Sequence, residues 1–250
     1  VAADGANSGI RKMAAIGVAG KAYDQHALVA TVGTGYPQED ITWQRFTPAG
    51  PQAFLPLSGP RASMVWYESA ETVAALKQLP DEEFLQAMTD AFPQKLGKLH
   101  KLYARGSFPL HWQHAEKYVQ SRLALVGDAA HTVHPLAGQG VNMGLLDVGA
   151  LVDCVLDSYR DGKDIGGLRT LRRYERWRQP ANELMIRFLD GIQRVFQPDS
   201  HKQLMKGVRT AALGGAQHIT PINEYCMRTA MGLTGNLPRM ARGRLPLEIS

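Results

Sequence analysis

The strongest hydrophobic pattern of the chain lies between residues 122 and 160, where an apolar run, a glycine-rich loop and a helical repeat follow one another. The run 123–126 is typical of a buried strand, and Gly127 closes it. From residue 140 to residue 159, apolar side chains recur every three or four positions, which predicts an amphipathic helix. The expected apolar side of this helix is formed by Leu145, Val148, Val152, Val155 and Tyr159, with Asp147, Asp153 and Asp157 elsewhere on its circumference.

The remaining patterns predict an antiparallel sheet followed by helices. Between residues 23 and 67, Pro/Gly turns separate the expected strands 27–32, 41–46, 53–57 and 63–67. Helices are expected over 70–78 and 81–92, and residues 99–108 can return as a strand. Helical spacing covers 168–178 and 183–196, and Pro180 between them forces a kink or a new start. The second of these helices is expected to pack through Leu184, Phe188, Ile192 and Phe196, before tail helices over 203–213 and 221–232 and a loosely ordered end from residue 237.

The composition indicates an ordinary globular protein of a reducing compartment. Of the 250 residues, 44% are hydrophobic and 20% charged, which is enough apolar material for a large core. The two cysteines, Cys154 and Cys226, are too few for a disulfide framework and lie in no metal-ligand pattern. No apolar run approaches the roughly 20 residues of a membrane span, and the N-terminus does not resemble a signal peptide. A cytoplasmic protein without a metal site is expected.

The excess of positive charge is local. The formal net charge is +5, and basic residues outnumber acidic ones in the segments 160–178 and 199–250. Such faces can meet nucleic acid, anionic lipid or a dinucleotide phosphate, and they can also be solvated helix surfaces. Because the chain has none of the zinc-finger or RNA-binding signatures, no nucleic-acid partner is predicted.

The residues that can bind a ligand gather where the strand 123–126 ends. Asp128 follows this strand at its carboxyl end, the place where open α/β sheets bind their ligands. Gly138 and Gly140 would let the backbone approach a ligand without a Cβ in the way. The first turn of the next helix offers unpaired N–H groups and a positive dipole end. Spacing alone leaves open whether Asp128 binds a ligand or only caps the helix.

Two motifs resemble those of the aromatic-hydroxylase flavoproteins. Residues 127–142 resemble their second flavin-binding motif, GDAAHxxxPxxGxGxN, through Gly127, Asp128, Ala129, Ala130, His131, Pro135, Gly138, Gly140 and Asn142. Near the N-terminus, Asp4, Gly5, Ser8 and Arg11 resemble the DGxxSxxR motif of the family. The resemblance spans about residues 1–195. Because no GxGxxG follows a strand near the start, the chain is expected to be a fragment that lacks roughly the first third of a typical member.

The resemblance implies an α/β fold with an α+β insertion. The expected architecture is a Rossmann-like FAD/NAD(P)-binding domain, incomplete at its N-terminus, with an inserted antiparallel-sheet substrate domain and a helical C-terminal tail. The expected boundaries are 1–20 for the flavin-domain segment with the DG motif, 21–115 for the substrate domain, 116–197 for the remaining flavin domain and 198–250 for the basic tail.

The resemblance also implies a class A flavin monooxygenase. Its cofactor is FAD, its co-substrates are NAD(P)H and O₂, and a flavin C4a-hydroperoxide hydroxylates an aromatic ring. Expected at the reacting edge are Pro135, Gly138 and Gln139. Expected to hold the cofactor are Asp4, Gly5, Arg11, Gly127, Asp128, Pro135, Gly138, Gly140, Val141 and Asn142. In this scheme Asp128 accepts hydrogen bonds from ribityl hydroxyls and the helix N-terminus stabilises negative charge on the reduced ring. The role implied for His131 is structural.

Within the family, residues 42–48, 53–57 and 65–67 are similar to the ubiquinone-biosynthesis hydroxylases, especially to those acting on the C6 position. Phe54, Pro56 and Trp66 are candidates for a substrate pocket, and a place in the sheet core is the alternative for each. The implied substrate is a polyprenyl quinol or phenol. Further implied partners are a multienzyme ubiquinone-biosynthesis complex, the inner face of the plasma membrane through the basic tail, and a second copy of the chain. Two other functions stay open: hydroxylation of a soluble phenolic acid, and an inert fragment or scaffold of this fold.

Overall fold

The chain divides into two compact units, which are described separately. The computed structural model describes residues 1–37, 40–47, 49–92, 97–134, 138–196, 228 and 234–244. The first unit comprises Val1–Lys21, His111–Val195 and Gln203–Ser250, and the second comprises Ala22–Leu110 and Phe196–Lys202. Strands β1 (Val18–Thr34) and β5 (Leu99–Ala115) belong to both units. The tail helices predicted over 203–213 and 221–232 lie outside the described residues, apart from residue 228.

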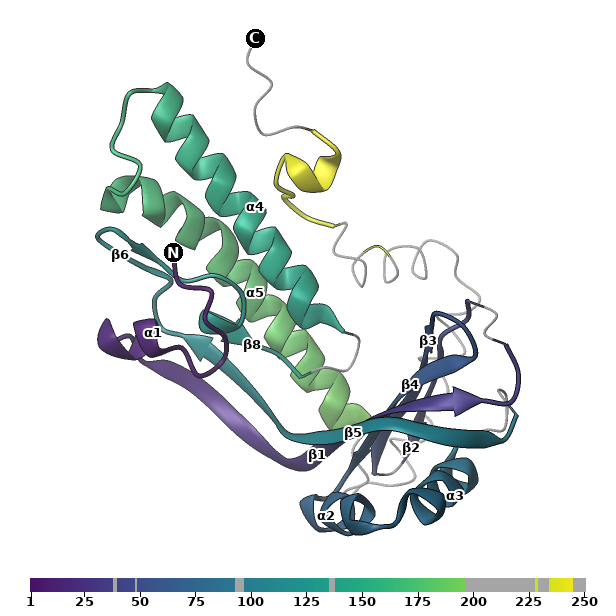
Figure 1. Cartoon of the computed structure of the whole chain (residues 1–250). Coiled ribbons are helices and arrows are strands. Elements are labelled where there is room, and N and C mark those ends of the chain that lie inside the picture. The colour runs from purple at the N-terminus through teal and green to yellow at the C-terminus, as the bar shows by residue number, and fades with distance from the viewer. Residues whose placement is uncertain are drawn as a thin grey trace. The chain divides into compact units, whose positions relative to one another are not determined.

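The second unit is an antiparallel sheet with two helices packed on one face (Figure 1). Strands β2 (Trp43–Thr47), β3 (Gly50–Leu57) and β4 (Arg61–Glu68) form consecutive hairpins, and the strand order is β2-β3-β4-β1-β5. Helices α2 (Ala70–Gln78) and α3 (Asp81–Ala91) follow. The Ser69 hydroxyl caps α2 by accepting the N–H of Thr72. The predicted elements are confirmed here, although β1 begins nine residues earlier than its apolar run indicates.

The core of the second unit lies between the sheet and these helices. Alternate strand residues such as Leu28 and Met64 point into it and meet Phe84 and Met88 of α3. Phe54 and Trp66 share this face: they are 4% and 9% exposed, and each packs edge-on against the ring of Phe92. The two side chains predicted to line a substrate pocket are therefore core residues, because α2 and α3 cover the face to which they belong.

Pro56 has a different environment. It lies at the end of β3 and lines a pocket of about 550 Å³ with Pro37, Asp40, Leu57, Ser58, Gly59 and Pro60. Its side chain is partly exposed. Of the three predicted pocket residues, only Pro56 therefore borders a space that a ligand could enter.

In the first unit, the two strands that precede the predicted motifs run side by side. The Ala2 N–H donates to the Ala124 carbonyl (2.8 Å), and the Val126 N–H donates to the Ala2 carbonyl (3.0 Å), which makes a parallel bridge. Around this bridge lie α1 (Gly9–Met13), the hairpin of β6 (Val119–Gln120) and β7 (Leu123–Ala124), the 3₁₀ turn η1 (Gly127–Ala129) and β8 (His131–Thr132). Because carboxyl ends of parallel strands meet at one edge, the turns that carry the two motifs follow at the same edge.

Helix α4 (Gln139–Arg160) buries a different face from the predicted one. Leu145, Val148 and Tyr159 are 65%, 43% and 73% exposed. The buried face instead contains Met143, Asp147, Ala150, Leu151, Asp153, Cys154 and Ser158. The prediction was wrong because polar side chains on this face have partners: Arg178 and Asn182 bind Asp147, and Thr170 donates to the Ser158 hydroxyl. By length and composition alone α4 could cross a membrane, but these buried polar contacts are those of a core helix.

Helix α5 (Leu168–Phe196) runs antiparallel to α4 and continues through Pro180 (Figure 1). Of the kink or new start expected at Pro180, the new start is absent. The expected packing face is wrong at Leu184 and Phe188, which are 71% and 54% exposed, and the side chains of Ile192 and Phe196 lie outside the described ones. The buried residues lie three or four positions apart on both sides of the proline, namely Tyr174, Arg178, Asn182, Ile186 and Leu189. Their shared contacts outweigh the cost of about 3 kcal/mol of a proline inside a helix.

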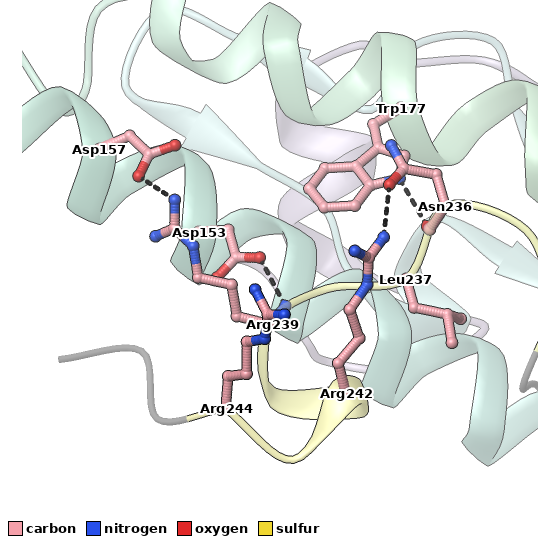
Figure 2. Close-up of a pocket in the computed structure, with 8 residues that line it drawn as sticks. All are labelled: Asp153, Asp157, Trp177, Asn236, Leu237, Arg239, Arg242 and Arg244. Atoms are coloured by element: carbon pink, nitrogen blue, oxygen red, sulfur yellow. Dashed lines mark hydrogen bonds and ion pairs between the residues drawn. The ribbon is translucent and has the colours of Figure 1, made fainter. Parts of the chain in front are cut away.

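Residues 234–244, here called the C-terminal strap, pack on α4 and α5 (Figure 2). The Arg239 N–H donates to Asp153 (2.9 Å), the Arg239 guanidinium pairs with Asp157 (2.5 Å), and the Trp177 indole donates to the Asn236 carbonyl (2.9 Å). A Cβ on Gly149 would lie 2.9 Å from Pro238, so the strap also needs a glycine on α4. The expectation of a loosely ordered end is thus wrong for residues 237–244, because α4 offers two carboxylates that neutralise and orient the strap.

Candidate functional site

Asp4 uses its carboxylate to build its own turn. The Ser8 hydroxyl donates to Asp4 Oδ1 (2.5 Å), and the Ile10 N–H donates to Asp4 Oδ2 (3.2 Å). The hydrogen bond from Ser8 is the main cause that holds the pKa of Asp4 below its ordinary value. Gly5 follows with a φ of +84°, which favours glycine. The DG turn is therefore rigid, and Asp4 contributes mainly to its shape.

Asp128 is the available carboxylate at this edge. It lies in η1 and is exposed, and within the described residues it has no hydrogen-bond or ion-pair partner. Gly127 before it adopts a φ of +58°. A Cβ built on Gly140 would lie 4.0 Å from Asp128 Oδ1, so the carboxylate stands beside the first turn of α4. Such an acceptor next to a helix N-terminus can bind a ligand that brings both hydroxyl groups and an electron-rich edge.

The N-terminus of α4 is open on the side of Gly138. This glycine is the N-cap, its φ is +64°, and no atom of the described chain lies within 4 Å of the place of a Cβ. Val141 is 73% exposed and Asn142 is partly exposed. Gly138, Gly140, Val141 and Asn142 therefore lie on the helix turn beside Asp128. Gln139 is only 3% exposed, and Pro135 lies outside the described residues.

Two glycines let α4 approach the turn closely. A Cβ on Gly144 would lie 3.2 Å from the Cα of Gly127, which is tighter than an ordinary contact. Gly144 lies in the first half of α4 and packs on the turn. A close contact between helix and strand end brings the helix dipole near the ligand edge.

Arg11 joins the two motifs from inside the protein. It is 4% exposed, and its guanidinium donates to the carbonyls of Ala129 (2.7 Å) and Ala6 (2.9 Å). The resemblance implies that Arg11 holds the cofactor, and in the structure two of its donors bind the backbone of the DG turn and of η1. Arg11 therefore supports the site by fixing the two turns relative to each other.

A buried polar cluster behind the turn has no counterpart in the sequence predictions. Asp147 is 0% exposed, and its Oδ2 accepts from His131 Nε2 (2.5 Å) and from the Gly127 N–H (3.2 Å). Its Oδ1 accepts from Arg178 Nε (2.9 Å) and Asn182 Nδ2 (2.9 Å). The structural role implied for His131 agrees with this place. The signal that could have revealed the cluster is an acid in the middle of an apolar helix face, with Arg and Asn four residues apart on the next helix.

The charge of Asp147 is stabilised by its neighbours. Burial by itself would raise the pKa of this carboxyl. The hydrogen bond from His131, the charge of Arg178 and the hydrogen bond from Asn182 outweigh burial, and the pKa of Asp147 lies below its ordinary value. Asp147 is therefore ionised and compensated inside the core.

His134 makes the stability of this region depend on pH. It is 1% exposed, and burial lowers its pKa from 6.5 to about 4. The unfolded chain therefore binds a proton below pH 6.5 that the folded chain does not bind until about pH 4. We expect the free energy of unfolding to fall by about 3 kcal/mol as the pH is lowered across this window, as measured by urea unfolding.

The His134→Leu variant should lose most of this pH dependence. A part should remain, because burial also lowers the pKa of the half-buried His114. The exposed His100 serves as the control, and His100→Gln should keep the full slope. An unchanged slope in His134→Leu would show that other groups cause the pH dependence.

The sequence is similar to an FAD-binding family and to known ubiquinone hydroxylases. A family described as "FAD binding domain" matches residues 1–189. The 3-demethoxyubiquinol 3-hydroxylase of Escherichia coli is 39% identical, over 93% of this chain and 59% of that protein. The ubiquinone hydroxylase UbiL of Rhodospirillum rubrum is 39% identical, over 97% of this chain and 57% of that protein. The chain thus spans somewhat less than 60% of the length of these relatives.

Solved structures share the fold. The p-nitrophenol 4-monooxygenase PnpA from Pseudomonas putida superimposes with a TM-score of 0.71 at 16% identity, over 94% of this chain and 59% of that one. PqsL from Pseudomonas aeruginosa, titled a probable FAD-dependent monooxygenase, gives 0.68 at 23% identity, over 83% and 57%. The expected α/β fold with an antiparallel insertion is confirmed. With a family match over most of its length and the DG and GD turns at one edge, the chain belongs to the family of FAD-binding domains.

Proposed function

We propose that the protein is an FAD-dependent monooxygenase that hydroxylates the ring of a polyprenylated phenol or quinol in ubiquinone biosynthesis. The observation that carries this proposal is the exposed, unpartnered Asp128 beside the N-terminus of α4, as seen in the described part of the chain. The relatives named as ubiquinone hydroxylases support the substrate class.

The residues at this edge fit a flavin. Asp128 can accept hydrogen bonds from the hydroxyls of the ribityl chain. Among the described residues nothing lies within 4 Å of a Cβ position at Gly138, and the positive dipole end of α4 favours negative charge on a ring held beside its first turn. When bound, FAD supplies the transfer of one oxygen atom of O₂ to a ring C–H, with NAD(P)H as electron donor and water as the second product.

The chain's own residues bind and orient in this scheme. Asp128 fixes the sugar-alcohol chain, and α4 directs its N–H groups at the electron-rich ring edge. Arg11 holds the two turns together, and the glycines at 127 and 144 allow α4 to pack closely on the second turn.

The proposal also includes a peripheral place at the inner face of the plasma membrane. The exposed Arg169, Arg172 and Arg176 of α5 form a basic surface of the kind that attracts anionic lipid. Arg239 of the predicted basic tail is not available for this purpose, because it pairs with Asp157. Assembly with other enzymes or with a second copy of the chain stays a prediction of the resemblance.

Replacing Asp128 by alanine tests the proposal. In the protein as it is encoded, including any residues before Val1, we expect FAD to bind about thirtyfold more weakly, which corresponds to about 2 kcal/mol for the loss of charge-assisted hydrogen bonds. Titration of FAD fluorescence measures the affinity, and hydroxylation of a short-tailed quinol measures the activity. Asp161→Ala removes an exposed carboxylate paired only with Lys163 in the described structure, and it should change neither quantity.

Equal FAD affinity in Asp128→Ala and in the unchanged protein would contradict the assigned site. Oxygenation of a hydroxybenzoate in place of the quinol would contradict the substrate class while it leaves the flavin site intact.

A further inference from the structure

We propose that the buried Asp147 is a positioning residue for FAD: together with Arg178 it fixes, from inside the protein, the turn that carries Asp128. The inference depends on the proposed function, since it concerns the affinity for FAD. It goes beyond that function by assigning a role in the site to helix α5, which supplies no group to the ligand edge.

One carboxylate oxygen of Asp147 accepts two hydrogen bonds from residues close to Asp128. Asp147 Oδ2 accepts from the N–H of Gly127 and from Nε2 of His131, the residues one position before and three positions after Asp128. A single oxygen therefore holds the first residue of η1 and the first residue of β8, on either side of Asp128. Because the Asp128 carboxylate itself has no partner in the described structure, its place depends on the backbone of this turn.

Two residues of α5 hold the Asp147 carboxylate in turn. Its Oδ1 accepts from Arg178 and Asn182, and Arg178 Nη2 donates in turn to Asn182 Oδ1 (2.8 Å). Arg178 and Asn182 are 5% and 1% exposed, so water does not compete for these bonds. The orientation of the Asp147 carboxylate, and through it the turn, is thus set by α5.

A positioning role and a general stabilising role predict different effects on FAD binding. If the cluster only stabilised the fold, its loss would weaken FAD binding no more than the loss of any equally buried bond in the same core. Tyr174 offers that comparison: it lies on α5, is 0% exposed and donates to the Leu125 carbonyl (2.7 Å), and in the described structure no hydrogen bond joins it to Asp147 or to the η1 turn. Tyr174→Phe is therefore a matched control.

The experiment uses the flavin-loaded protein as encoded and a charge-balanced double variant, Asp147→Leu with Arg178→Met, which leaves no buried charge unpaired. We expect its affinity for FAD to fall about tenfold, as measured by fluorescence titration. Amide exchange measured by mass spectrometry should become about tenfold faster in the peptide covering residues 125–132, because the Gly127 N–H loses its acceptor. Tyr174→Phe should lower the melting temperature but leave the FAD affinity and this exchange rate within twofold.

Two further variants keep the test decisive. Asp147→Asn with Arg178→Met restores an oxygen acceptor and should recover FAD affinity to within threefold of the unchanged protein. Asn182→Leu keeps the Asp147–Arg178 pair, and it should weaken FAD binding about threefold; it replaces the double variant if that protein does not fold.

The outcomes separate the two proposals. Failure of the unchanged protein to bind FAD would overturn the proposed function. FAD binding by the unchanged protein and, equally tightly, by the Asp147→Leu, Arg178→Met double variant would overturn the positioning role alone. A loss of affinity in Tyr174→Phe as large as in the double variant would show that the cluster acts only through stability.

Discussion

Replacing Arg178 by methionine is expected to destabilise the protein by about 3–5 kcal/mol, because the ionised Asp147 then stays in the core without its counter-charge. Asp147 is 0% exposed, and Arg178 Nε lies 2.9 Å from its Oδ1. The same change removes the bond from Arg178 to Asn182. Urea unfolding followed by circular dichroism measures the free energy of unfolding in both proteins.

The neighbouring Arg176 supplies the control. It is exposed, and its guanidinium donates only to the Arg172 carbonyl of its own helix in the described structure, so Arg176→Met should change the stability by less than about 0.5 kcal/mol. The double variant with Asp147→Leu should be more stable than Arg178→Met alone, since both charges are gone. Equal or lower stability of the double variant would show that packing, and not the unpaired charge, causes the loss.

Replacing Arg11 by methionine is expected to cost about 3–5 kcal/mol as well, through two hydrogen bonds of a buried guanidinium. The Ala129 carbonyl would lose the Arg11 donor, whereas the Ala6 carbonyl would keep Gln113 as a second donor (2.6 Å). Since Arg11 connects the DG turn to η1, the variant should also bind FAD more weakly. Thermal unfolding and FAD titration on the same samples measure the two effects.

Lys12→Met on the same short helix provides the comparison. Lys12 is exposed, so this substitution should leave the unfolding free energy within about 0.5 kcal/mol. If Arg11→Met were as stable as Lys12→Met, the bonds to the two carbonyls would not hold the motifs together.

The sequence predicted the elements whose information is local. The strands expected over 53–57 and 63–67, the helix expected over 70–78 and the strand before Gly127 each depend on residues a few positions apart, and the structure has them. The resemblance to flavoproteins also predicted the family correctly.

What the sequence could not predict depends on partners far along the chain. The apolar pattern of α4 pointed to Leu145 and Val148, but the buried face is set by Asp147, whose partners come 31 and 35 residues later. The continuity of α5 through Pro180 likewise follows from packing on both sides of the proline. Phe54 and Trp66 are a further example. The sequence pattern of an aromatic residue in a strand is the same whether a helix or a substrate covers its side chain.

The C-terminal strap affects how an experiment with a C-terminal deletion is interpreted. Asp153 is 5% exposed and takes its bond from the backbone of Arg239, while Asp157 pairs with the Arg239 side chain. A protein that stopped before Leu237 would lose both bonds and uncover the part of α4 on which the strap packs. Loss of lipid or partner binding after such a deletion would therefore report damage to the interior of the first unit, and point substitutions at exposed arginines of α5 are the sounder way to map an outer surface.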